Sequence, residues 1–98
     1  MKREQVLQVL TQNQQTLRSL YVKSLALFGS VARDEATPDS DVDLLVEFEQ
    51  GHPKGLFEFI SVMNVLEDLL GCKVDLVMLD GLRKEFREQV LKEAIRAA

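Results

Sequence analysis

The hydrophobic residues of this chain recur at two periods, one typical of helices and one typical of strands. Residues 3 to about 20 show the helical period, with a break near Asn13. Residues 56–70 form the clearest helix, and Gly71 is placed to end it. We expect its apolar stripe to face the core: Leu56, Phe59, Ile60, Met63, Leu66 and Leu70. A last helix is expected from about Leu82 to Ala97 with these residues inward: Leu82, Phe86, Val90, Leu91, Ala94 and Ile95.

Three shorter segments predict strands. The apolar run of residues 25–28 ends at Gly29, which is typical of a buried strand that enters a tight turn, and a short helical turn follows from Ser30. Residues 42–49 and 73–79 instead alternate between apolar and other side chains, so each strand has a core face and an opposite face. Loops are expected at residues 34–40 and 50–55, which contain proline, glycine and other turn-forming residues.

This order of elements predicts an α/β (α+β) fold with a small mixed sheet of three to four strands and helices mainly on one face. At 98 residues the chain is expected to form one domain, residues 1–98. On both alternating strands the apolar residues share one side and the aspartates share the other. The pleat that builds the core should therefore present carboxylates together on the opposite face.

Three aspartates on that face are candidate metal ligands. Asp41 and Asp43 are two positions apart, so their side chains should emerge on the same face with Cα atoms about 7 Å apart. Asp75 would supply a third carboxylate if the two strands are neighbours. Carboxylate oxygens are ligands that Mg²⁺ prefers, and two Mg²⁺ ions about 4 Å apart can stabilise attacking and leaving oxygens in phosphoryl chemistry.

The junction of Gly29 and Ser30 has the features that a triphosphate requires. A glycine avoids Cβ crowding, and the start of the helical turn offers backbone N–H groups and a hydroxyl donor. Arg33, one turn onward, could add a charge-assisted contact to a phosphate. The alternative for Arg33 is a surface ion pair with Asp34, Glu35 or Glu47. A Gly-Ser pair alone is a weak signal, since most such pairs are ordinary turns.

Taken together, these residues resemble the signature of the minimal nucleotidyltransferases, a branch of the DNA polymerase beta superfamily. The resemblance rests on Gly29-Ser30, ten intervening residues and Asp41-Val42-Asp43, and on the segment from Lys73 to Val77 that carries Asp75. It implies that Gly29 and Ser30 hold phosphates, that Asp41 and Asp43 bind both metals, and that Asp75 binds the catalytic metal. We assign Arg33 and Ser40 to the nucleotide-binding set as well.

The resemblance also implies an activity and a partner. Similar proteins transfer AMP from ATP to a hydroxyl and release pyrophosphate, and bacterial and archaeal forms commonly act as antitoxins that adenylylate a tyrosine of a HEPN-domain toxin. The expected cofactors are two Mg²⁺ ions, with ATP as substrate. Two alternatives remain open. One is a non-catalytic antitoxin that neutralises its partner by complex formation, and the other is nucleotidyl transfer to a small molecule or RNA end.

Composition narrows the partners further. The net charge of −4 argues against binding of an extended nucleic acid, because such binding depends on clustered Lys and Arg. With 46% hydrophobic and 29% charged residues, the chain has neither a membrane-spanning stretch nor the h-region of a signal peptide. Its one cysteine, Cys72, is expected to be a buried thiol. These features favour a cytoplasmic protein. Homo- and hetero-oligomers are both compatible with the sequence.

Overall fold

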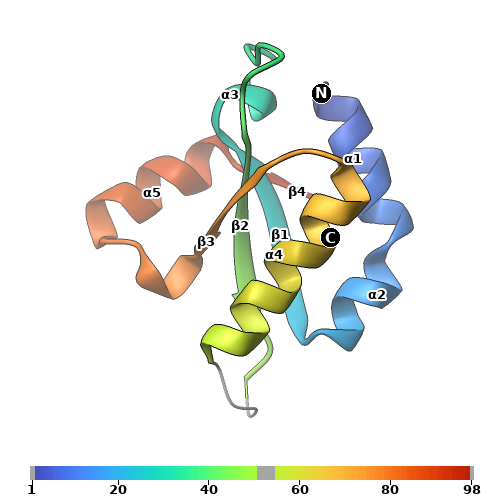
Figure 1. Ribbon diagram of the computed structural model, residues 1–98. Coiled ribbons are helices and arrows are strands. Elements are labelled where there is room, and N and C mark those ends of the chain that lie inside the picture. Colours follow the sequence, from blue (N-terminus) through green and yellow to red (C-terminus); the bar gives the residue numbers. More distant parts are fainter. Residues whose placement is uncertain (1, 51–54, 98) are drawn as a thin grey trace.

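The computed structural model describes residues 2–50 and 55–97, which form one four-stranded sheet and the helices around it (Figure 1). The elements in chain order are α1 (Arg3–Gln12), α2 (Gln14–Ser19), β1 (Val22–Phe28), α3 (Gly29–Ala32), β2 (Val42–Phe48), α4 (Leu56–Leu70), β3 (Val74–Met78), the 3₁₀ turn η1 (Leu79–Gly81), α5 (Lys84–Glu93) and β4 (Ile95–Arg96). Part of the loop predicted at 50–55, residues 51–54, lies outside the described residues. The break predicted near Asn13 is confirmed, since it separates α1 from α2.

The sheet has the strand order β3-β2-β1-β4 and is mixed. Strand β1 is antiparallel to both β2 and β4, whereas β2 and β3 are parallel and are joined by α4. The end of α4 follows the predicted signal, because Gly71 adopts the left-handed conformation with φ 67°. The predicted fold class is therefore confirmed, with four strands.

The core lies between the sheet and helices α1, α2 and α4, which cover one of its faces (Figure 1). Every second residue of β2 points into it, as the alternation predicted. Several of its leucines have no exposed surface: Leu10, Leu25, Leu27, Leu44 and Leu66. Since each buried leucine removes apolar area from water, this layer supplies most of the hydrophobic stabilisation of the fold.

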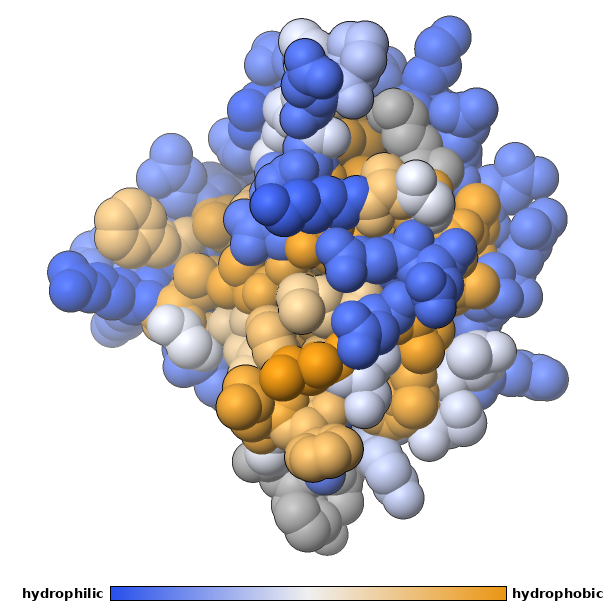
Figure 2. Space-filling view, viewed as in Figure 1, coloured by the Kyte–Doolittle hydropathy of each residue, from blue (hydrophilic) through white to orange (hydrophobic). Residues whose placement is uncertain are grey.

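The first two turns of α4 are more exposed than predicted. Leu56 and Ile60 were expected in the core, but Leu56 is 75% and Ile60 is 40% exposed, while Val62 is fully buried in their place. The reason is the position of the helix. Phe59 on these turns still packs against the core, but the start of the helix stands off the sheet, where Leu56 lines an open cavity of about 520 Å³ with Phe48 and Leu76. Figure 2 shows apolar surface over this part of the molecule.

The prediction of one C-terminal helix from Leu82 to Ala97 is wrong. Helix α5 ends at Glu93, and the chain then becomes extended to form β4, where the N–H of Ala97 donates to the carbonyl of Leu25 at 2.8 Å. The open edge of β1 accounts for this change, because its N–H and C=O groups need partners. Two of the side chains expected to point inward are also exposed, Phe86 by 57% and Leu91 by 48%.

Helix α5 lies over the sheet face opposite the core. Leu45 of β2 is buried on that face, although it lies outside the main core cluster. Together with Leu91 and Ala94 it lines a cavity of about 300 Å³ between α5 and the sheet. No described residue of α5 itself is buried. The helix therefore covers part of the aspartate-bearing face through a small, separate contact.

Two further observations concern the environment of the chain. Cys72 is half-buried against the core, and burial raises the pKa of its thiol. Across residues 2–50 and 55–97, none of the helices is long and apolar enough to cross a membrane.

The main core and the smaller contact under α5 should differ in how much they stabilise the fold. We expect Leu66→Ala to lower the free energy of unfolding by about 2–5 kcal/mol, since it leaves a cavity in a fully packed core. Leu91→Ala should lower the free energy of unfolding by less than about 1 kcal/mol, because about half of that side chain is already exposed to water. Urea unfolding of both variants tests this, and equal losses would contradict the separation of the layers.

Candidate active site

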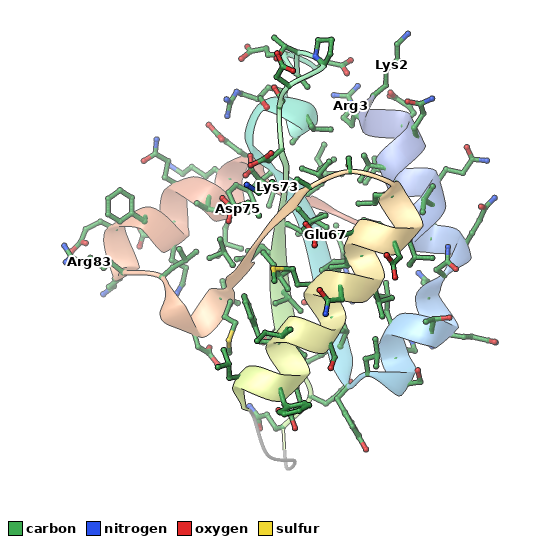
Figure 3. All side chains as sticks on the ribbon, in the orientation of Figure 1. Lys2, Arg3, Glu67, Lys73, Asp75 and Arg83 are labelled. Atoms are coloured by element: carbon green, nitrogen blue, oxygen red, sulfur yellow. The ribbon has the colours of Figure 1, made fainter. Side chains whose placement is uncertain are left out.

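Asp43 and Asp75 lie side by side on neighbouring strands. The parallel pairing of β2 with β3 sets Asp43 opposite Asp75, as it sets Val42 opposite Val74. Paired residues of adjacent strands are about 5 Å apart, so the two carboxylates share one place on the face opposite the core. Asp41 directly precedes β2, two positions before Asp43, and is exposed like Asp75. Figure 3 shows Asp75 on β3, on the side of the sheet that α5 occupies.

The turn from β1 into α3 brings Gly29 against Asp43. Phe28, the last residue of β1, pairs with Asp43, so the next residue begins directly beside this carboxylate. Gly29 has φ +75°, a conformation that other residues rarely adopt. A Cβ at this position would overlap a carboxylate oxygen of Asp43 and would lie 2.9 Å from its Cγ. Both the backbone conformation and the space therefore require glycine.

The electrostatics of Asp43 reflect this crowding. Burial raises the pKa of the Asp43 carboxyl, and the negative charges of Asp75 and Asp41 raise it further. The Arg33 guanidinium acts in the opposite direction on the same pKa. A carboxylate that is destabilised by its neighbours gains most from a nearby cation, because the cation offsets both the burial and the repulsion.

The carboxylates at this site can be compared with the coordination that Mg²⁺ prefers. Within the described part of the chain, no three His, Cys, Asp or Glu side chains form a group that could hold a metal ion by themselves. Mg²⁺ is usually held by one or two carboxylates together with water and substrate phosphates. The paired Asp43 and Asp75, with Asp41 beside them, fit an ion whose coordination the nucleotide completes.

Helix α3 has four residues, Gly29–Ala32, and its N-terminus lies at the Gly29 turn. The first N–H groups of a helix have no partners within it, so they are available to an anion. Ser30 is half-buried next to Gly29, and its carbonyl accepts from the N–H of Glu35 at 2.8 Å, which ties the following loop to the helix. This hydrogen bond therefore fixes the turn whose N–H groups are available to an anion.

Two arginines hold the far end of α3. Arg33 forms ion pairs with Glu35 and with Glu93 of α5, each at 3.2 Å, so its guanidinium is engaged at the surface. The ion pair with Glu35 matches the alternative given for Arg33, a surface ion pair. The ion pair with Glu93 was not predicted. Arg3 of α1 donates to the carbonyl of Ala32 at 3.4 Å. Sequence analysis missed Arg3, because nothing in a helical pattern marks a contact with so distant a residue.

Ser40 is occupied in the loop that precedes Asp41. Its hydroxyl accepts a hydrogen bond from the N–H of Thr37 at 3.0 Å, and its own N–H donates to the carbonyl of Thr37 at 3.0 Å. These bonds close a turn that leads into Asp41. The geometry thus gives Ser40 a structural contact, and its predicted role in nucleotide binding stays a prediction.

Comparison with known proteins agrees with this arrangement. A family model described as a nucleotidyltransferase domain matches residues 5–97. The chain is 41% identical over 93 residues to the protein adenylyltransferase MntA of Thermococcus cleftensis, across 94% of this chain and 92% of that protein. A solved structure provisionally described as a minimal nucleotidyltransferase superposes with a TM-score of 0.83 and 41% identity, covering 97% of this chain and 95% of that chain.

A more distant structure shares the fold. A chain from the crystal structure of a toxin–antitoxin with AMP-PNP superposes with a TM-score of 0.70, covering 100% of this chain and 73% of that chain. Its identity is 19%, so the likeness extends to the fold alone. With the family model and the closer relative, the resemblance drawn from the Gly-Ser turn and the aspartates is confirmed: the chain belongs to the nucleotidyltransferase family, in its minimal form.

Proposed function

We propose that this enzyme is a Mg²⁺-dependent protein adenylyltransferase that acts as an antitoxin, transferring AMP from ATP to a tyrosine hydroxyl of a HEPN-domain toxin. The observation that carries the proposal is the position of Gly29 against Asp43, with Asp75 paired beside it. The turn proposed to bind phosphate and two carboxylates thus meet at one place. The name of the relative from Thermococcus cleftensis and the AMP-PNP in the toxin–antitoxin neighbour support the same activity.

Each part of the site has a role in this transfer. The N–H groups at Gly29 and Ser30 would hold the β- and γ-phosphates, so that the α-phosphate lies over the aspartates. Asp41 and Asp43 would hold both ions, and Asp75 the one beside the acceptor. When bound, magnesium supplies charge neutralisation and polarisation of the phosphate oxygens. The side chains keep these groups in place, which is the main task in phosphoryl chemistry.

The bond changes are those of a simple substitution at phosphorus. The acceptor oxygen forms a bond to the α-phosphorus, and the bond from that phosphorus to the oxygen shared with the β-phosphate breaks. Pyrophosphate leaves with the electron pair of that bond, and the acceptor hydroxyl loses its proton to a nearby carboxylate or to water. Asp75 is exposed on the face that an acceptor would approach, so it is suited to receive this proton.

The chain supplies the donor half of the reaction and little of the acceptor half. Asp41 and Asp75 are both exposed. A site that binds a small acceptor usually buries most of it in a cavity. A protein acceptor brings its own surface, and its tyrosine could reach the exposed aspartates without an enclosing pocket. An open site of this kind favours a protein over a small molecule as acceptor.

The test incubates the chain with ATP labelled at the α-phosphate, Mg²⁺ and the protein encoded by the neighbouring gene. We expect label on a tyrosine of that protein, no label when EDTA is present, and recovery when Mg²⁺ is restored. Mass spectrometry identifies the modified residue. Label on a small molecule or an RNA end would overturn the choice of acceptor, and label that persists in EDTA would overturn the metal dependence.

A further inference from the structure

Lys73 lies at the edge of the carboxylate site. The N–H of Val42 donates to the carbonyl of Lys73 at 3.1 Å, and Val42 pairs with Val74, so Lys73 stands beside Asp41 across the two strands. It also precedes Asp75 by two positions, so both side chains emerge on the same side where the chain enters β3. Figure 3 shows the labelled side chains of Lys73 and Asp75 next to each other at the start of this strand.

The ammonium group of Lys73 is uncommitted, unlike the nearby arginines. Arg33 is held by Glu35 and Glu93, and Arg3 by Glu4, Asp34 and the carbonyl of Ala32. In the part of the chain that the structure describes, Lys73 makes no ion pair and no side-chain hydrogen bond, and it is exposed. A cation beside acidic groups that forms no pair with them is free to contact another anion.

The strand order indicates which anionic group Lys73 would contact. The Gly29 turn follows β1, on one side of β2, whereas Lys73 precedes β3 on the other side. With its β- and γ-phosphates at that turn and its α-phosphate over the aspartates, as proposed above, a triphosphate would extend across β2 toward β3. Lys73 would then lie nearer to the α-phosphate than to the other two phosphates. In that arrangement an acceptor would approach from the β3 side, because it attacks opposite the leaving pyrophosphate.

We propose that Lys73 is a catalytic residue that contacts a non-bridging oxygen of the α-phosphate on the acceptor side. This inference rests on the proposed nucleotidyl transfer and adds a residue to it. The negative charge at the α-phosphate is redistributed as the acceptor oxygen approaches, and a fixed ammonium group stabilises that arrangement. Lys73 exchanges no proton in this role, so the bond changes given above remain unchanged.

The test compares Lys73→Met and Lys73→Arg with the wild type in the labelling assay, with kcat and the KM for ATP measured separately. Lys73→Met keeps the length of the side chain and removes its charge. We expect its kcat to fall about 10- to 100-fold, the effect of losing one hydrogen bond to a charged group. The KM for ATP should stay near the wild-type value, because the turn at Gly29 still holds the other phosphates.

Lys73→Arg should recover part of the lost kcat, since it restores the charge. Lys84→Met is the matched control: Lys84 is an exposed lysine at the start of α5, and its loss should leave kcat unchanged. Equal thermal midpoints for all variants would exclude unfolding as the cause. An unchanged kcat for Lys73→Met, or a higher KM with unchanged kcat, would overturn the role of Lys73. A wild type that labels nothing would instead count against the proposed transfer itself.

Discussion

The double variant Asp41→Asn, Asp43→Asn is expected to lose more than about 10³-fold in labelling rate while remaining folded. Loss of one preorganised hydrogen-bond donor in an active site commonly costs about 10²–10³-fold in kcat, and this variant removes two charges from the proposed metal site. Its stability should move in the opposite direction. Burial and the charges of Asp75 and Asp41 raise the pKa of Asp43, so the native fold holds this carboxylate at a cost. A neutral amide at position 43 relieves that cost.

The measurements for this variant are labelling of the partner and the thermal midpoint without metal. We expect lost labelling together with an equal or higher midpoint. The control is Asp39→Asn, Asp68→Asn, which removes the same charge from two exposed positions outside the site and should leave labelling intact. Full neutralisation of the partner by the inactive double variant would favour the non-catalytic antitoxin. A lower midpoint would contradict the destabilising effect assigned to the Asp43 charge, and intact labelling would contradict the role of the two aspartates in the transfer.

Gly29→Ala is expected to reduce labelling by on the order of 10²-fold, the loss that a misplacement of about 1 Å can produce. The new Cβ would overlap the Asp43 carboxylate, so either the turn or Asp43 must move. Positive φ adds a backbone cost of about 1–2 kcal/mol for any residue with a Cβ. Labelling kinetics and urea unfolding measure the two effects separately.

Gly71→Ala is the matched control for that variant. Gly71 also has positive φ, 67°, but a Cβ there would meet nothing within 4 Å. It should therefore show the backbone cost alone, about 1–2 kcal/mol, with normal labelling in the folded protein. If Gly29→Ala labels its partner as well as Gly71→Ala does, the contact between Gly29 and Asp43 is not needed for activity.

The site was more predictable than the rest of the molecule because strand parity is a local property. Once residues 42–49 are read as a strand, Asp43 must lie on the face opposite Val42, and the same holds for Asp75 and Val74. The sequence alone could not show that β2 and β3 are neighbours in a register that pairs Asp43 with Asp75. That register depends on the crossover through α4, which is a tertiary property.

The incorrect predictions concern segments in which tertiary contacts override the local sequence pattern. The residues near Ile95 continue a helical period, yet they pair with β1, because an open strand edge leaves N–H and C=O groups without partners. Leu56 belongs to an apolar stripe but lines an open cavity beside Phe48 and Leu76 and is not part of the packed core. Periodicity shows which side of a helix is apolar, and it does not show how far the neighbouring layer extends.

The parallel pairing of β2 with β3 has a consequence for the timing of activity. Asp43 and Asp75 are distant in the chain and meet only after α4 has crossed over and β3 has docked. Such long-range parallel pairing is intrinsically slow to form, since the loop must close before the contact stabilises it. A nascent chain that ends before β3 carries the Gly29 turn and two aspartates but lacks the third. If Asp75 has the role proposed above, nucleotidyl transfer begins only after synthesis has passed residue 75, and shorter translation products are inactive.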